Sequence, residues 1–383
     1  MQPFYLCPMK VRVHSPRSVQ GFSLIELMIS MAITLVIVVA ASLMYLSVRE
    51  TDSTQSKVSD SLETGTFALQ LIGRDIAQAG TYPVVMPPTT QYFPAGRWLE
   101  FYPPTDWSTE LSNTPYQSGL FGCDGGTFNS TTATCVASTA MAPYRSAPDS
   151  IVINYFTTDA SNTPVGNRDD CSGADAGKDL INASRKLNTV PNILTDPVVP
   201  TVENKDLPPY RPVFVSNRYG LNDTTTEIDK QAVTTKSLAC NGNGMNGSKP
   251  GDAKTGNTYY PILLGVEDLQ ITYGVSLIKN PTDPTRMDLA PSQFYKASEI
   301  AALGAVDFED QNFQPWDRVT AVRVCMMTRT LGGSSRIQDK SGAARTYLDC
   351  TDDTPQSYAA TDTSLRKRHM QVFALRNHLT QTY

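Results

Sequence analysis

A long run of apolar positions lies near the N-terminus of the chain. No charged residue occurs from Leu27 to Val48. Because an α-helix rises about 1.5 Å per residue, about 20 such residues cross the hydrocarbon core of a bilayer. The run therefore predicts a membrane-spanning helix. The residues before it include Lys10, Arg12 and Arg17 and no acid up to residue 21, so the positive-inside rule predicts a cytoplasmic N-terminus and an exported body.

A second apolar pattern follows at helical spacing. Five apolar residues 3, 4 or 7 positions apart share one helical face: Val58, Leu62, Leu69, Ile72 and Ile76. Gly80, with Pro83 soon after it, predicts the end of this helix. We expect one continuous helix over residues 22–79. Two separate helices are the alternative, because Gly65 and Gly73 weaken the helical pattern.

From residue 81 onward the pattern changes to short alternating runs, which predict strands. The clearest runs cover residues 150–158, 212–216, 267–277, 318–330 and 368–377. In the fourth run, Val322 and Val324 alternate with Arg323 and Cys325, which is typical of an antiparallel sheet with one solvated face. Residues 292–305 predict a short helix. The pattern as a whole predicts an α+β fold, with a long N-terminal helix packed on a β-rich antiparallel head.

One part of this head has a different texture. The stretch at about 159–260 is rich in Asn, Asp, Gly, Pro and Thr, and we expect a loop-rich insertion there. The chain has 383 residues, enough for one large domain or two ordinary ones, and a formal net charge of -5. An acidic body has no electrostatic footprint for nucleic acid, so we expect no nucleic-acid partner.

The cysteines divide at the apolar run. Cys7 precedes the run and six cysteines follow it. In an exported body an even set predicts disulfides, although six cysteines allow fifteen pairings. We expect nearest-neighbour pairs, with free buried thiols as the alternative: Cys123–Cys135, Cys171–Cys240 and Cys325–Cys350.

The start of the apolar run, "GFSLIEL", resembles the N-terminal motif of type IV pilins. The resemblance implies that a prepilin peptidase cuts between Gly21 and Phe22 and methylates the new Phe22 amine. Residues 1–21 would then be a leader that is removed together with Cys7. Glu26 would be the fifth residue of the mature chain, and its carboxylate would pair with such an amine during filament assembly. A charge in the bilayer is costly unless it is paired, which gives a physical reason for that role.

Two other interpretations of the run remain open. A cleaved secretory signal would have a shorter apolar region, and a plain signal anchor would leave Glu26 unexplained. The pilin resemblance also carries one departure. Major pilins usually have a glycine and a proline inside this helix, where this chain has Leu35 and Leu43. This departure favours a minor pilin with an uninterrupted helix.

The C-terminal third carries a second resemblance. Its segments "GVEDLQITYGV" (265–275), "DRVTAVRVCMMTRT" (317–330) and "RHMQVFALRNH" (368–378) are similar to the PilW family of minor pilins. Each of these segments also has a purely structural interpretation, and Glu267 and Asp268 could form a solvated turn. Arg376 and Asn377 could equally be a polar tail.

Candidate chemistry is sparse. His14, His369 and His378 are isolated, and neither a nucleophile elbow, a phosphate-binding loop nor a zinc helix occurs in the sequence. The oxygen-rich segments 169–177 and 240–247 do not follow the calcium-loop pattern. We therefore expect a protein that is not an enzyme and that holds neither a metal nor a cofactor.

These observations predict a PilW-like minor pilin that helps to initiate or cap pilus assembly and so supports piliation, twitching motility or adhesion. Its expected parts are the leader, a membrane helix over 22–48, a periplasmic continuation over 49–80, and the head over 81–383. The expected partners are other minor pilins, the major pilin, a tip adhesin and the processing peptidase. The protein would reside in the bacterial inner membrane and then at the pilus tip. One alternative is a J-type minor pseudopilin of a type II secretion system. The other is a membrane-anchored adhesin or enzyme, whose mark would be a pocket with converging polar groups in the middle region, or sugar binding by the aromatic residues between 92 and 107.

Overall fold

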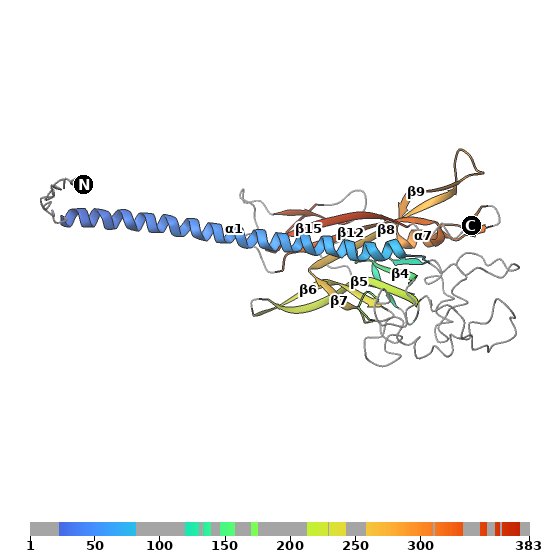
Figure 1. Cartoon of the computed structure of the whole chain (residues 1–383), viewed down its shortest axis with the longest axis horizontal. Helices are drawn as coiled ribbons and strands as arrows, with labels where there is room; N and C mark the ends of the chain where they lie inside the picture. The colour runs from blue at the N-terminus through green and yellow to red at the C-terminus, as the bar shows by residue number, and fades with distance from the viewer. Residues whose placement is uncertain are drawn as a thin grey trace, which may run out of the picture. The chain divides into compact units, whose positions relative to one another are not determined.

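The structure is a computed structural model of the whole chain. It describes residues 23–81, 119–129, 132, 134–138, 146–157, 170–174, 213–228, 230–242, 258–308, 311–331, 345–350, 357–360 and 362–375. The chain divides into two compact units, Met1–Gln55 and Ser56–Tyr383. The helix α1 (Leu24–Gln78) contributes to both units and is continuous over its 55 residues (Figure 1). The two glycines within it, Gly65 and Gly73, do not interrupt it.

In the first unit, α1 is an apolar helix without a covering layer. Every described residue from Ser23 to Ser53 is exposed. The side chains from Leu24 to Val48 are nearly all apolar, and Glu26 is the one charged residue among them. Isolated α-helices of this length satisfy their own backbone hydrogen bonds, so the apolar surface can be exposed to lipid or to other proteins.

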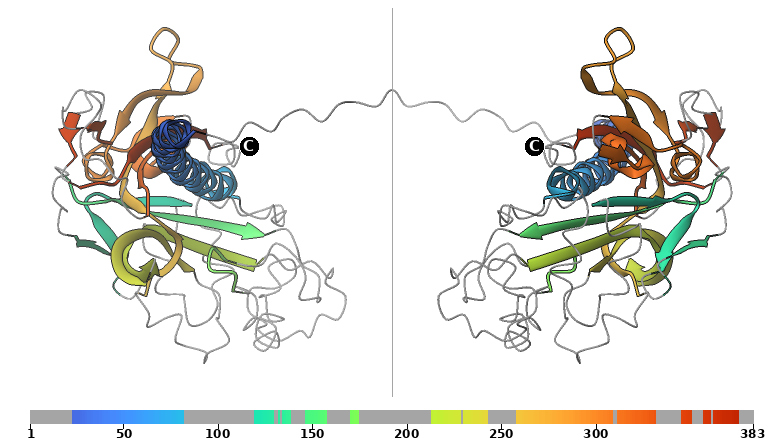
Figure 2. Two further views of the ribbon diagram at one scale, coloured as in Figure 1. Left: turned by 90° about the vertical axis from the view of Figure 1, so that its left-hand side faces the viewer. Right: turned by 90° about the vertical axis from the view of Figure 1, so that its right-hand side faces the viewer.

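The second unit is built on two antiparallel sheets. The larger sheet has the strand order β1 (Leu120–Cys123), β4 (Ser150–Thr157), β5 (Val213–Ile228), β6 (Gln231–Gly242) and β7 (Tyr260–Leu264). The smaller sheet has the order β15 (Arg366–Ala374), β12 (Val319–Arg329), β8 (Val266–Lys279) and β9 (Met287–Tyr295). Figure 2 shows strands of the two sheets on different sides of the C-terminal half of α1.

Smaller elements complete the described part of the head. Three two-stranded pairs are β2 (Gly126–Asn129) with β3 (Thr134–Ala137), β10 (Val306–Phe308) with β11 (Gln311–Phe313), and β13 (Thr346–Leu348) with β14 (Ser357–Ala359). The short helix α7 (Ala297–Ala301) and the 3-10 turn η2 (Pro315–Arg318) lie between strands.

One core joins α1 to both sheets. Ile72 and Ile76 of α1 are completely buried, together with Tyr219 of the larger sheet and Leu269 and Val324 of the smaller one. The helix therefore supplies part of the hydrophobic driving force of the head, since burying one large aliphatic side chain contributes about 1.5–3 kcal/mol.

The buried face of α1 differs from the prediction in its first part. Leu69, Ile72 and Ile76 are buried as expected, but Val58 and Leu62 are 36% and 40% exposed. In this part of the helix the buried positions are small residues instead: Ser61, Gly65 and Ala68. A stripe of small residues allows a strand to approach the helix axis closely, and β15 occupies that space.

The glycines of α1 mark this close approach. A Cβ atom at Gly65 would overlap the ring of His369, and one at Gly73 would overlap the ring of Phe373. Eight helical residues rise about 12 Å and four strand residues about 13 Å. Helix and strand therefore run side by side in the same direction over this stretch.

Most predicted strands of the C-terminal third lie where the alternation placed them, in β8, β12 and β15. The predicted solvated face of β12 is wrong, since Cys325 and Met327 are also buried. The guanidinium of Arg323 on that face lies over the ring of Phe294, 4.0 Å from its centroid. The helix predicted over 292–305 is shorter, because β9 extends to Tyr295.

The loop-rich range of about 159–260 also needs correction. It contains β5 and β6, which pair along twelve positions from Asn217–Gly242 to Ile228–Gln231. Threonines opposite each other form a hydroxyl hydrogen bond, 3.1 Å between Thr225 Oγ1 and Thr234 Oγ1. The polarity of the threonines suggested a loop, although threonine favours strands. Cross-strand threonine pairs of this kind stabilise the hairpin.

Candidate assembly site

The predicted N-terminal site is described from residue 23 onward. Gly21 and Phe22 lie outside the described residues, whereas Glu26 lies in the first turn of α1 and is exposed. Its Oε2 accepts a hydrogen bond from the backbone N–H of Ser23, 2.9 Å away. The Ser23 side chain in turn accepts from the backbone N–H of Ile25, at 3.4 Å.

This geometry holds the carboxylate at the positive end of the helix dipole. Glu26 thus satisfies one of the backbone donors that a helix leaves free at its N-terminus. Its Oε1 makes no hydrogen bond to any described residue. The carboxylate can therefore accept a further donor, such as an ammonium group at the same level, without leaving its place on the helix.

The surface around Glu26 matches a membrane or a helical partner. Within the described part of the chain, α1 is the one helix long and apolar enough to cross a membrane. Large side chains from Leu24, 78% exposed, to Val48, 61% exposed, form its surface. An apolar area of this extent on a protein marks a lipid or protein contact.

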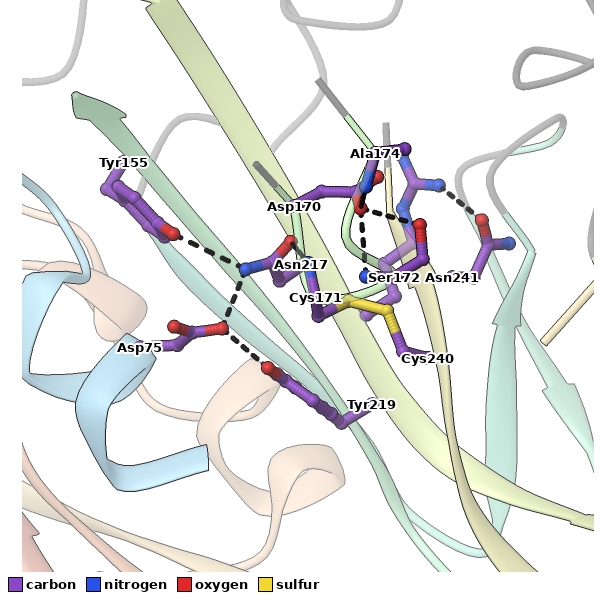
Figure 3. Close-up of a disulfide and its surroundings, with 11 residues drawn as sticks. Asp75, Tyr155, Asp170, Cys171, Ser172, Ala174, Asn217, Tyr219, Cys240 and Asn241 are labelled. Atoms are coloured by element: carbon purple, nitrogen blue, oxygen red, sulfur yellow. Dashed lines mark hydrogen bonds between the residues drawn. A yellow bond between two sulfur atoms is a disulfide. The ribbon is translucent and has the colours of Figure 1, made fainter. Parts of the chain in front are cut away.

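A buried polar network anchors the other end of α1 to the larger sheet (Figure 3). Asp75 is 1% exposed, and its Oδ2 accepts from Asn217 Nδ2 and from the Tyr219 hydroxyl, each at 2.6 Å. Asn217 also donates to the Tyr155 hydroxyl at 3.4 Å, and its Oδ1 accepts from the backbone N–H of Cys171 at 2.9 Å. One side-chain amide thus connects the helix to the Cys171–Cys240 disulfide.

The electrostatics of this network follow from its burial. Desolvation raises the pKa of Asp75, although its hydrogen bonds with Tyr219 and Asn217 oppose the shift. Desolvation also raises the pKa of Tyr219, and the nearby Asp75 charge adds to that effect. The Arg74 guanidinium lies 3.6 Å from Asp75 Oδ1 but is largely exposed, so its contribution is screened.

A second polar chain holds α1 against the smaller sheet. Ser61 Oγ and Thr328 Oγ1 are 2.9 Å apart, and Thr328 Oγ1 is 2.9 Å from His369 Nε2. Thr328 is completely buried on β12, and His369 lies on β15. Burial lowers the pKa of His369, with a smaller contribution from Lys367. The isolated histidine of the sequence therefore packs against the helix.

An ion-pair cluster joins β8 to β15. Glu267 is 3% exposed at the start of β8 and accepts from Arg366 Nε at 2.7 Å and from Arg329 Nη1 at 2.9 Å. Arg366 also donates from Nη1 to Asp362 Oδ1 at 2.7 Å. The solvated-turn interpretation of Glu267 and Asp268 is therefore wrong. Arg376 and Asn377 lie outside the described residues.

Asp149 links the two sheets directly. Its carboxylate accepts from the backbone N–H groups of Gly125, at 2.7 Å, and Ile271, at 2.8 Å. Burial raises the pKa of Asp149 to about 7, partly opposed by these two hydrogen bonds. Asp268 lies three residues before Ile271, and burial raises its pKa to about 6.

The six downstream cysteines are joined as nearest neighbours in the structure. The Cα–Cα distances are 5.5 Å for Cys123–Cys135, 6.0 Å for Cys171–Cys240 and 5.6 Å for Cys325–Cys350. The first joins the end of β1 to β3, the second joins the turn at residues 170–174 to β6, and the third joins β12 to the segment after β13. The second and third disulfides thus hold irregular segments to strands, whereas the first joins two strands.

Other candidates from the sequence carry no site in the described residues. Asp170 forms a local turn, in which its Oδ1 accepts from the backbone N–H groups of Ser172 and Ala174 at 2.8 and 3.0 Å. The described ranges contain no group of three or more side chains suited to hold a metal ion. The aromatic residues between 92 and 107 and the segment 243–247 lie outside the described residues.

Sequence reasoning missed the network of Asp75 and the cluster of Arg366. Asp75 has a detectable signal, since a carboxylate on the apolar stripe between Ile72 and Ile76 must be buried or break the stripe. Its partner Asn217 is 142 positions away and carried no signal.

Comparison with family models gives two matches. The model described as Type IV Pilus-assembly protein W matches residues 226–377, from the end of β5 to just after β15. The model described as Prokaryotic N-terminal methylation motif matches residues 16–42, which include Gly21, Phe22 and Glu26. No curated protein and no solved structure matches the chain.

Proposed function

We propose that this chain, a PilW-like type IV pilus-related pilin with a prepilin motif, is a minor pilin that helps to initiate or cap pilus assembly. The observation that carries the proposal is the exposed apolar surface of α1, in which Glu26 is the one charge between Leu24 and Val48. This apolar surface lies in the membrane before assembly and packs against other subunits afterwards. The Glu26 carboxylate sets the depth in the membrane at which this packing occurs.

The mechanism begins with processing. Cleavage after Gly21 creates an amine at Phe22, one residue before the N–H that Glu26 accepts in the structure. Glu26 pairs with this amine or with that of a neighbouring subunit. A lone charge in the centre of a membrane helix costs about 2.5–3.5 kcal/mol on insertion scales, so pairing favours the assembled state.

A minor role is supported by the uninterrupted helix. Leu35 and Leu43 occupy the positions where abundant shaft subunits usually carry glycine and proline, and α1 is continuous through both. Helix breakers let a shaft subunit extend or melt locally, whereas a subunit without them stays rigid. The head then presents its surfaces to sibling pilins, the major pilin or a tip adhesin, first in the periplasm and then at the filament tip.

The test is the Glu26→Ala variant expressed in a cell that makes pili. We expect normal membrane levels and at least about a tenfold loss from sheared filaments, because breaking a buried ion pair costs about 3–5 kcal/mol. Glu50→Ala, an exposed carboxylate further along the same helix, is the matched control and should leave incorporation unchanged. Equal recovery of Glu26→Ala and wild type would refute the proposal.

Two measurements separate the alternatives. The mass of the mature N-terminal peptide should show an N-methylated Phe22, and an intact leader would exclude processing as a prepilin. Deletion of the gene should abolish surface pili while leaving protein secretion intact. The opposite result would identify a minor pseudopilin of a secretion system instead.

A further inference from the structure

β15 forms one edge of the smaller sheet and is regular along its length. Its nine residues pair with β12 without a register shift, from Ala321–Ala374 to Arg329–Arg366. The opposite edge strand, β9, contains Pro291 and has two register shifts against β8. Proline and bulges protect a sheet edge from pairing, so β9 is protected by devices that β15 does not have.

The pairing pattern shows which backbone groups of β15 point outward. Thr330 N donates to Leu365 O, and Leu375 N donates to Thr320 O, so odd-numbered residues of this strand turn their backbone groups toward β12. The even-numbered residues turn theirs to the outer edge. From residue 368 to 374 these groups make no backbone hydrogen bond to any described residue.

The side chains on the same edge have a definite chemistry. Met370 is 54% exposed and Val372 is 51% exposed, and both lie on the face away from α1. The Arg368 guanidinium contacts Cys325 Sγ at 3.4 Å and Met370 Sδ at 3.5 Å, and no described carboxylate pairs with it. Lys367 beside it is exposed. In chain order, the strand therefore offers two basic charges, Lys367 and Arg368, and then two apolar contacts, Met370 and Val372.

We propose that the outer edge of β15 binds an extended segment of another protein, which adds to the sheet as an antiparallel strand. The segment carries apolar side chains opposite Met370 and Val372 and a carboxylate opposite Arg368, because directly opposed side chains set cross-strand affinity. A second copy of β15 is a poorer occupant, since residues 366–374 contain three basic residues and no acid. This inference goes beyond the proposed assembly role and does not depend on Glu26.

The probe is the nine-residue peptide TTVTVTEET, added to the full-length protein in detergent and followed by calorimetry. In the antiparallel register its two valines face Val372 and Met370, and its glutamates face Arg368 and Lys367. A peptide N-methylated at positions 3, 5 and 7 loses the donors that face β15. It should bind at least about tenfold more weakly, because three backbone hydrogen bonds are removed. N-methylation at positions 2, 4 and 6, which face away, is the matched control.

Two sets of variants test the protein side. Val372→Pro removes an outward N–H and leaves the ladder to β12 complete, so it should abolish binding while Val372→Thr retains it. The double variant of Lys367→Glu and Arg368→Glu should reject the acidic peptide and bind TTVTVTKKT instead. A thermal melt close to wild type verifies that each variant is folded.

Three outcomes would overturn the proposal. They are no binding of the acidic peptide to the wild type, binding that Val372→Pro does not change, and a homodimer that Val372→Pro dissolves. The last outcome would assign the edge to a second copy of this chain. None of them bears on filament incorporation, so failure here is distinguishable from failure of the assembly role.

Discussion

Replacing Asp75 tests whether the polar network holds α1 in the head. In Asp75→Ala, the Asn217 amide and the Tyr219 hydroxyl lose their common acceptor and stay buried. An unsatisfied buried donor costs about 1–3 kcal/mol, and removing the desolvated carboxylate offsets part of the loss. We therefore expect the free energy of unfolding to fall by about 2–4 kcal/mol.

Asp75→Asn separates hydrogen bonding from charge. The oxygen of the new amide can accept from both donors, so we expect a free energy of unfolding within about 1 kcal/mol of wild type. The measurement is denaturant unfolding of the oxidised full-length protein, followed by tyrosine fluorescence. Asp60→Ala, at an exposed position of α1, is the control for loss of a helical carboxylate. If Asp75→Ala were as stable as the wild type, the network would contribute nothing to docking of the helix.

Two further predictions concern the packing and the pH dependence of the head. Gly73→Ala should gain about 1 kcal/mol of helix propensity but lose more by overlap with the Phe373 ring, for a net loss of about 1–2 kcal/mol in denaturant unfolding. A net gain in stability would show that helix and β15 do not approach so closely. Because burial raises the pKa of Asp149 to about 7 and of Asp268 to about 6, the folded state binds these protons more tightly than the unfolded state. The stability from these two groups is complete below about pH 4 and is lost up to about pH 7, so thermal melts should show a higher unfolding temperature at pH 5 than at pH 8, and equal temperatures would contradict the burial argument.

The features that the sequence predicted well are carried by local patterns. The N-terminal motif lies within a few residues around Phe22, and the helix stop at Gly80 needs only neighbouring residues. β8 and β12 are recognisable because their apolar residues recur at the short spacings of a strand. The α+β fold with an antiparallel head follows from these patterns alone.

The missed features depend on distant partners. Small residues such as Gly65 carry no apolar signal, so the buried face of α1 was placed on Val58 and Leu62 instead. A glycine is favourable there only because His369 of β15 lies against it. The prediction of a solvated face on β12 was wrong for a similar reason. The alternation of Arg323 with valines cannot show that Phe294 lies against the Arg323 side chain.

The burial of α1 within the head determines where the protein can be cut. Ala68, Leu69, Ile72 and Ile76 are core residues of the same cluster as the sheets. A soluble fragment that begins at Ser56 retains all four, whereas one that begins at Thr81 would expose the apolar surfaces that they cover. A protease that releases the head from its anchor without unfolding it must therefore cut before the buried stripe starts at Ser61.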